Sequence, residues 1–177
     1  MKNSKTAATQ ARIKPLVGIL TGSPNDLPTV VKVRDALTEL GIPSEIVVAS
    51  AHRTPEKVLA YIKRAHAQGV QVLIGAAGVA AHLAGVVAAH TRLPVIGLPL
   101  GNGPLSGLDS LLSTVQMPPG VPVATVAIDG AKNAAFLAAR ILALKYPEID
   151  QALENAAQAE RARYDRSADD ALAKLTA

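Results

Sequence analysis

The stretch EIVVASAHRTPEKVLAYIKRAHAQG, Glu45 to Gly69, is one complete strand-turn-helix unit, and the repetition of this unit decides the fold. An apolar run ends at Ala49, the polar turn SAHRTP follows, and Pro55 opens a segment with apolar residues at helical spacing. Thr54 is a suitable N-cap, proline is tolerated in the first helical turn, and Gly69 is a helix stop signal. The stretch therefore predicts a buried strand that leads through a polar turn into a helix.

Four further stretches repeat this order of apolar run, turn and amphipathic segment. Their apolar runs are PLVGIL, VQVLIGA, PVIGLPL and PVATVAI, and each precedes a segment with helical periodicity. Strands that are apolar along their whole length are covered on both faces, as in a parallel sheet. We predict an α/β fold with three layers (α/β/α): a doubly wound parallel sheet of about five strands, with an extra helix at the C-terminus.

The length and composition favour one domain with an aliphatic core. The chain has 177 residues, of which 49% are hydrophobic and 2% aromatic, which suits small and branched side chains packed between a sheet and helices. We predict a flexible tail over residues 1–14 and an α/β domain over residues 15–149. Residues 150–177 are polar, with sparse apolar residues at helical spacing, and form either a solvated terminal helix or an arm at an oligomer interface.

Composition also excludes several classes of function. The chain contains no cysteine, which rules out disulfides and thiolate metal ligands and fits a reducing compartment. A formal charge of +4 with three Tyr, one Phe and no Trp argues against a nucleic-acid partner and suits a small anionic ligand. The first fourteen residues lack the apolar centre of a secretion signal, and no run reaches the roughly 18 apolar residues of a membrane span. We expect a cytoplasmic protein with no membrane contact.

The turn after the first strand is the first candidate for a binding site. In open parallel sheets, ligands bind beyond the carboxyl ends of the strands, where helix N-termini present free N–H groups to anions. This turn contains Ser23, Asn25 and Asp26, which supply a hydroxyl, an amide and a carboxylate. Such groups suit a phosphate and a pair of sugar hydroxyls. The alternative is that Asn25 or Asp26 is an ordinary helix N-cap.

The turn SAHRTP is the second candidate. Ser50 and Arg53 both donate hydrogen bonds that match a phosphate, and the planar guanidinium fits its oxygens. His52 lies between them, where a group with an unperturbed pKa of about 6.5 is suited to proton transfer. A surface loop that holds this triplet by chance is the alternative.

The third and fourth turns are the remaining candidates at the carboxyl ends of the predicted strands. Residues 76–81 carry almost no side chains, so a flat ligand can approach the backbone. His82, about one turn into the predicted helix, either faces the ligand or satisfies a carbonyl, whereas His66 and His90 are interpreted as structural. The fourth connection, GLPLGNGPLSG, has the composition of a loop that closes over a site; a passive linker is the alternative.

Several of these segments together resemble one family. SAHRTP, GSPND, AAHLAG, LSGLDSLLSTVQMPPGVPVATVAI and AKNAA are similar, in this order, to the PurE family, the class I N5-carboxyaminoimidazole ribonucleotide mutases of de novo purine synthesis. The resemblance runs from about Val17 to Ile149 and implies a flavodoxin-like α/β/α catalytic domain. It also implies a homo-octamer with active sites at subunit junctions, and no metal or organic cofactor.

The resemblance implies a role for each site residue. In the family's reaction a carboxyl group leaves the exocyclic nitrogen of a ribonucleotide as carbon dioxide and is recaptured by a ring carbon. His52 is then the general acid and base, and Ser23, Asp26 and Arg53 hold the ribose and phosphate. The further residues expected to line the site are Ser50, Gly78, His82, Leu83 and Ser106.

Four positions depart from the family pattern. Asn25 replaces a serine and still donates a hydrogen bond, so it stays a substrate-binding candidate; Ala76, Val79 and Ala84 depart in the third segment. Val79 stands at a glycine position, and a β-branched residue there is strained if the backbone needs a positive φ. Two alternatives to the mutase follow: a direct carboxylase of aminoimidazole ribonucleotide or a related nucleotide, and a non-catalytic nucleotide-binding paralogue. Arg53 and the AAHL run favour the mutase class.

Overall fold

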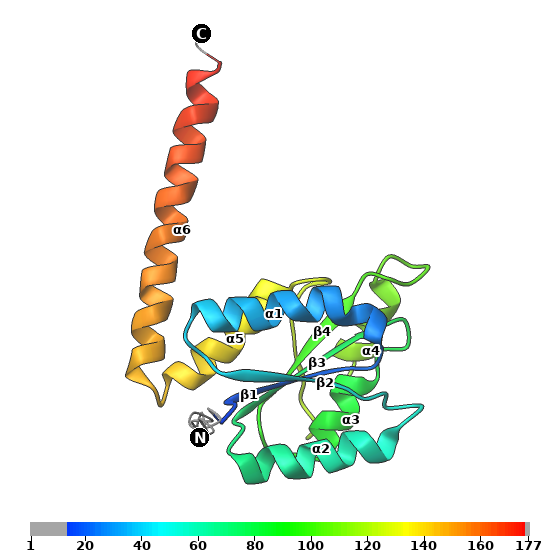
Figure 1. Cartoon of the computed structure of the whole chain (residues 1–177). Coiled ribbons are helices and arrows are strands. Elements are labelled where there is room, and N and C mark those ends of the chain that lie inside the picture. Colours follow the sequence, from blue (N-terminus) through cyan, green and yellow to red (C-terminus); the bar gives the residue numbers. More distant parts are fainter. Residues whose placement is uncertain (1–13, 176–177) are drawn as a thin grey trace, which may run out of the picture.

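The computed structural model describes residues 14–175, so the expected tail over residues 1–14 lies almost entirely outside the described part. Five parallel strands form one sheet in the order β2-β1-β3-β4-β5 (Figure 1). This order is that of the flavodoxin-like doubly wound folds, and the predicted fold class is confirmed. The strands are β1 (Val17–Thr21), β2 (Ser44–Val48), β3 (Val72–Gly78), β4 (Val95–Leu100) and β5 (Ala124–Thr125).

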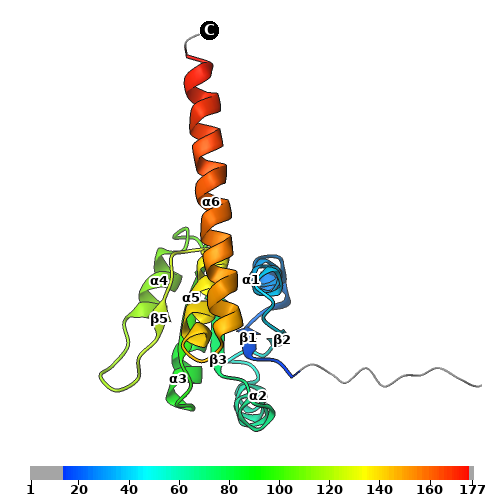
Figure 2. The same ribbon diagram turned by 90° about the vertical axis from the view of Figure 1, so that its left-hand side faces the viewer.

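Helices cover both faces of the sheet, which gives the three expected layers (Figures 1 and 2). One face packs against the first and fifth helices, and the other against the second, third and fourth. The helices are α1 (Leu27–Glu39), α2 (Pro55–Gln68), α3 (Leu83–Ala89), α4 (Leu108–Val115), α5 (Ala131–Ala143) and α6 (Pro147–Ala173), with a short 3-10 helix at Pro24–Asp26 before α1.

The core is aliphatic, as the composition predicts. Ile19, Ile74 and Leu98 are fully buried in the sheet, and each such side chain stabilises the fold by about 1.5–3 kcal/mol. Small residues bring helices close to the strands: a Cβ on Gly75 would lie 2.8 Å from the Cα of Ala84 in α3. Ala84, one of the departures from the family pattern, therefore belongs to this tight contact and not to the surface of a site.

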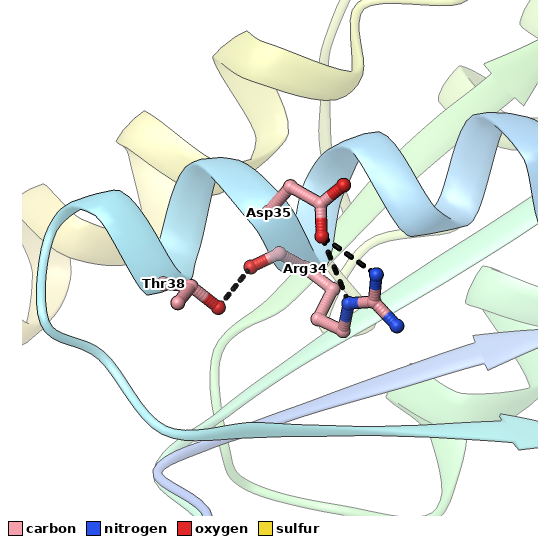
Figure 3. A network of polar contacts seen from close by, with 3 residues as sticks. All are labelled: Arg34, Asp35 and Thr38. Atoms are coloured by element: carbon pink, nitrogen blue, oxygen red, sulfur yellow. Dashed lines mark hydrogen bonds and ion pairs between the residues drawn. The ribbon is translucent and has the colours of Figure 1, made fainter.

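The outer face of α1 is polar and faces solvent (Figure 3). The Arg34 guanidinium donates to the carboxylate of Asp35 at 2.7 and 2.9 Å, and the Thr38 hydroxyl donates to the carbonyl of Arg34 at 2.9 Å. All three contacts are exposed and local, so they contribute little to stability. Val30, Val33 and Leu37 on the opposite face are fully buried, which is the amphipathic pattern read from the sequence.

Strand β5 is shorter than the apolar run PVATVAI predicts, because only Ala124 and Thr125 pair with β4. The carbonyl of Pro99 in β4 faces this side, where it accepts from the backbone N–H of Asp129 at 2.9 Å. In a parallel strand the nitrogen of the same residue faces the same side, and the proline nitrogen carries no hydrogen. The ladder is therefore interrupted here, although the chain continues beside β4.

Helix α3 begins later than predicted. Residues 76–78 belong to β3, and His82 occupies the N-cap position of α3 instead of lying one turn inside it. Val79 adopts a left-handed backbone with φ 56°, and tight turn bonds join Ala81 to Val79 and His82 to Ala80. This irregular turn delays the helix and brings the imidazole of His82 to the carboxyl edge of the sheet.

Helix α6 leaves the domain body after its first turns (Figures 1 and 2). Ile149 is buried against the α1–α5 side of the core, and Leu153 and Ala156 pack partly on the same cluster. Further along, Tyr164 is 72% exposed, so this half of the helix adds little to the core of a single chain. Within residues 14–175, no helix combines the length and the apolar character that crossing a membrane requires.

Candidate active site

A cavity of about 120 Å³ lies at the carboxyl ends of β1, β2 and β3, at the edge where the sequence predicts a site. Three strand-to-helix turns contribute to its walls, so residues far apart in the chain meet there. The lining residues are Gly22, Ser23, Asp26, Ser50, Ala51, His52, Arg53, Ala77, Gly78, Ala80 and Leu83.

In the first turn, the carboxylate of Asp26 makes contacts other than helix capping. Ser23 is the residue that caps, because its hydroxyl accepts from the N–H of Asn25 at 3.2 Å. Asp26 occupies the N-cap position of α1 without a side-chain capping bond, and it is only 6% exposed. Its oxygens accept from Thr21 Oγ1 at 3.0 Å and from Asn102 Nδ2 at 2.7 Å. Asp26 therefore has the cap position that the alternative expected, but its carboxylate makes no capping bond, and Asn25 lies inside the 3-10 helix and not at a cap position.

The second turn is tied to the first by Arg53. The Arg53 guanidinium donates to the carbonyl of Gly22 at 2.8 Å, and its Nε donates to the Ser50 hydroxyl at 3.4 Å. The Ser50 hydroxyl also accepts from the N–H of Arg53 at 3.2 Å, and the Thr54 hydroxyl accepts from the N–H of Ser50 at 3.0 Å. These contacts gather the hydroxyls of Ser23 and Ser50 and the guanidinium of Arg53 on one wall.

Two histidines from different turns form a hydrogen-bonded pair. His52 Nε2 lies 2.9 Å from His82 Nδ1, and the rings meet edge to face at 89° with their centroids 5.0 Å apart. One proton lies between these nitrogens, so one ring donates and the other accepts. His82 does not itself line the cavity in a single chain; it contacts the cavity through His52, which does line it.

Val79 and Ser113 fix the turn that holds His82. Val79 has φ 56°, so the condition under which the sequence predicts strain at this position is met. The Ser113 hydroxyl in α4 accepts from the N–H of Ala81 at 3.2 Å, and its one hydrogen has two nearby acceptors, the carbonyl of Asp109 and, at 3.2 Å, that of Val79. Helix α4 thus braces a strained turn beside the histidine pair.

The structure does not bring every predicted residue to the cavity. Asn25 lines a neighbouring cavity of about 340 Å³, together with Asp26, Lys32 and Asn102. Ser106 lies in the loop after β4 with φ 52° and does not line either cavity in a single chain. His66 and His90 line a separate groove between α2 and α3. His90 is satisfied by the carbonyl of Val86 at 2.8 Å, as its structural interpretation requires.

Sequence reasoning missed three residues that position this site: Thr21, Asn102 and Ser113. Thr21 ends β1 and Asn102 follows β4 by two residues, so both stand at the carboxyl edge where polar groups gather. That position was the available signal for them; Ser113, inside α4, gave none. Within residues 14–175, no group of three or more His, Asp or Glu side chains is arranged to hold a metal ion.

Comparison with known proteins identifies the family of this arrangement. The family model described as AIR carboxylase matches residues 16–163, which include every turn of the cavity. The chain belongs to the AIR carboxylase family. The matched region ends inside α6, so it includes the part of α6 that packs on the domain.

Named members of the AIR carboxylase family are close in sequence. The N5-carboxyaminoimidazole ribonucleotide mutase of Pyrococcus horikoshii is 59% identical over 140 residues, which cover 79% of this chain and 79% of that protein. The mutase of Thermotoga maritima is 57% identical over 135 residues, which cover 76% of this chain and 79% of the relative.

Solved structures in the AIR carboxylase family share the fold. PurE of Treponema denticola superposes with a TM-score of 0.80 at 32% identity, covering 86% of this chain and 95% of the other. A variant of PurE2 from the same organism gives a TM-score of 0.81 at 31% identity, covering 88% and 96%. The whole α/β body of these proteins is therefore represented in this chain.

Proposed function

We propose that this AIR carboxylase family protein is a mutase of de novo purine biosynthesis that converts N5-carboxyaminoimidazole ribonucleotide into 4-carboxy-5-aminoimidazole ribonucleotide. The observation that carries the proposal is the meeting of Ser23, Asp26, Ser50, His52 and Arg53 around one cavity. The names of the relatives from Pyrococcus horikoshii and Thermotoga maritima support the same reaction.

Different side chains of the polar wall would bind different groups of a ribonucleotide. Arg53 has a planar fork that matches phosphate oxygens, and the hydroxyls of Ser23 and Ser50 are further donors for the same group. Asp26 is a carboxylate acceptor for the ribose hydroxyls, held from behind by Thr21 at 3.0 Å. Gly78 and Ala77 line the cavity beside His52 and bring little or no side chain of their own, which suits a flat heterocycle close to His52.

The histidine moves one proton in each half of the reaction. When the bond between the exocyclic nitrogen and the carboxyl carbon breaks, its electron pair stays on nitrogen, and nitrogen takes a proton from His52. A ring carbon then attacks the released carbon dioxide, and the proton that this carbon loses returns to His52. No net proton is gained or lost over the cycle, which fits an isomerisation. His82 lies 2.9 Å from the imidazole of His52 and is its hydrogen-bond partner.

The apolar part of the wall has a role of its own. Ala51, Ala77, Ala80 and Leu83 offer no hydrogen bonds from their side chains to water. Carbon dioxide between the two half-reactions is retained only if it is held close and water is kept out. An apolar wall beside His52 meets that need without a metal or an organic cofactor.

One observation favours a second candidate, the direct carboxylase. Val79 replaces a glycine of the family pattern and is held at φ 56° next to the histidine turn. Val79 is exposed and does not line the smaller cavity itself, but a changed turn beside His82 would suit a carbon dioxide supply from solution. The non-catalytic paralogue would keep the phosphate groups and lose both reactions.

A pair of assays separates these candidates. The purified protein is mixed either with N5-carboxyaminoimidazole ribonucleotide or with aminoimidazole ribonucleotide plus bicarbonate, and the carbon-carboxylated product is followed by its absorbance. We expect rapid turnover in the first assay. Turnover in the second assay alone would identify a carboxylase, and binding with no turnover in either would identify a nucleotide-binding paralogue.

We further propose that the active protein is a cytoplasmic homo-oligomer, an octamer as the family resemblance implies, with residues 15–149 as the catalytic domain. Leu108, Leu112 and Val115 form a stripe on the outer face of α4, and they are 52%, 47% and 45% exposed. An apolar stripe of this kind on a single chain suits burial against another subunit. It lies next to the loop that holds Ser106, so a neighbouring chain there would extend the wall of the site. Residues 150–177 would be a second point of attachment.

A further inference from the structure

Asp26 stands on the wall of two cavities. The cavity that contains His52 and Arg53 measures about 120 Å³, and the neighbouring cavity lined by Asn25, Lys32 and Asn102 measures about 340 Å³. Pockets for small-molecule ligands usually measure about 300–1,000 Å³. In a single chain, the smaller cavity, which holds the candidate catalytic group, lies below this range.

Asn102 lies at the partition between the two cavities. Its Nδ2 donates to Asp26 Oδ1 at 2.7 Å, while its Oδ1 lies only 1.8 Å from the position a Cβ on Gly78 would occupy. Gly78 lines the smaller cavity, and Asn102 lines the larger one. The amide thus covers the glycine backbone and occupies one oxygen of the carboxylate at the same time.

The Asn102 amide resembles the ligand group that Asp26 is expected to bind. An NH₂ group and a ribose diol both present two donor hydrogens, and a carboxylate accepts either. The Thr21 hydroxyl already holds the other oxygen of Asp26 at 3.0 Å from inside the domain. A ribose that approaches from the smaller cavity therefore competes with Asn102 and not with Thr21.

The loop that carries Asn102 joins β4 to α4. Gly101 and Gly103 flank the asparagine, and Gly107 ends the loop with φ 90°. Beyond the loop, α4 is fixed, because the buried Ser110 hydroxyl lies 2.9 Å from the carbonyls of both Leu100 and Gly107 and shares its one hydrogen between them. Asn102 therefore lies in a short loop that is anchored at Gly101, whose N–H donates to Asp129 at 3.1 Å, and again at α4.

We propose that Asn102 is a latch on the nucleotide site: its amide holds Asp26 in the empty protein, and ribose hydroxyls must displace it to join the two cavities. This inference rests on the proposed function, because it takes a ribonucleotide as the ligand. Breaking the contact between Asn102 and the carboxylate is a cost of binding, and a variant without the amide avoids it.

The test is the affinity for the reaction product, 4-carboxy-5-aminoimidazole ribonucleotide, measured by calorimetry on the full chain. We expect Asn102→Ala to bind about tenfold tighter than the wild type, in line with a hydrogen bond to a charged group. Pro104→Ala, in the same loop but outside this contact, is the matched control and should change affinity by less than about twofold. In an Asp26→Asn background, Asn102→Ala should have a smaller effect, because only a neutral amide oxygen is left to accept from Asn102.

Equal or weaker binding by Asn102→Ala would overturn the latch, and so would an equal gain in Pro104→Ala. The turnover of the wild-type protein, measured in parallel, tests the proposed function independently of the latch. If the wild type turns over and Asn102→Ala gains nothing, only the latch is wrong. If neither the wild type nor any variant binds the nucleotide or turns over the substrate, both proposals are wrong. If only Asn102→Ala binds the nucleotide and no protein turns over the substrate, the latch is supported and the mutase is not.

Discussion

The proton between His52 and His82 couples the two rings, because only one of the nitrogens 2.9 Å apart can donate. His82 is a positioning residue in this account: it sets which nitrogen of His52 carries the proton that meets the substrate. We expect His82→Asn, which keeps a residue suited to the N-cap position, to lower kcat at least about tenfold. The Kd for the product should change by less than about threefold. A steady-state assay beside calorimetry checks this, and an unchanged kcat would remove His82 from the mechanism.

At position 79, glycine should give a more stable protein than alanine, which is the reverse of their usual order. A non-glycine residue at φ 56° carries left-handed strain, so Val79→Gly should be more stable than Val79→Ala by about 1 kcal/mol in urea unfolding. The control is Ala60→Gly at an exposed position inside α2, where glycine should be the less stable residue by about 1 kcal/mol. If alanine is favoured at both positions, the left-handed turn at Val79 is wrong.

Among single residues, those with a clear chemical role could be predicted and those that position them could not. The hydroxyl, carboxylate, imidazole and guanidinium of Ser23, Asp26, His52 and Arg53 stand in turns that follow apolar strands, and the structure brings them together. Asn102 joins Asp26 across 76 positions of sequence. No local pattern reports such a pairing, since it depends on where two loops meet in space.

The packing of α2 on β1 and β2 leaves a buried hydroxyl without a partner. Tyr61 is 4% exposed, and its Oη has no hydrogen-bond partner among the described residues. Burial raises the pKa of Tyr61 well above its usual 10.0, and the negative charge of Glu45 raises the same pKa further. The neutral phenol is therefore favoured in the folded state, and the contribution to stability is present below pH 10 and falls as the pH rises above it.

Tyr61→Phe should separate these effects. At pH 7 we expect the variant to be as stable as the wild type or more stable by up to about 1 kcal/mol, because an unpartnered buried hydroxyl is lost. Between pH 9 and about 11 the free energy of unfolding should fall less in the variant than in the wild type. Tyr164→Phe, at a tyrosine that is 72% exposed, is the control and should follow the wild type. Equal pH slopes for Tyr61→Phe and the wild type would contradict the burial of this hydroxyl.

The order of elements followed from periodicity, but two boundaries did not. Five apolar runs, each followed by a helical pattern, predicted the parallel sheet and its covering helices. The end of β5 depends on the missing hydrogen of Pro99 in the neighbouring strand, and the start of α3 depends on the left-handed turn at Val79. Both causes lie outside the composition of the affected element, so its own sequence could not indicate them.

For the whole molecule, the outer stripe of α4 predicts assembly. Leu112→Glu puts a charge in the centre of this stripe, and burying it without a partner against a second chain is costly. We expect the wild type to have the mass of a homo-oligomer by light scattering and Leu112→Glu to have a lower mass with an unchanged circular dichroism spectrum. Leu144→Glu, at a residue that is 90% exposed outside the stripe, should keep the wild-type mass. An identical mass for all three proteins would exclude α4 from the interface.

If the edge of the sheet binds a ribonucleotide and His52 moves its proton, His52→Asn should lose turnover and keep its affinity for the nucleotide. With N5-carboxyaminoimidazole ribonucleotide as the substrate, the account predicts rapid turnover by the wild type and a loss of about 10²–10⁴-fold in the variant. The Kd for the carboxylated product should stay within about threefold, because Ser23, Asp26 and Arg53 are unchanged. A variant with near-normal turnover would contradict the account.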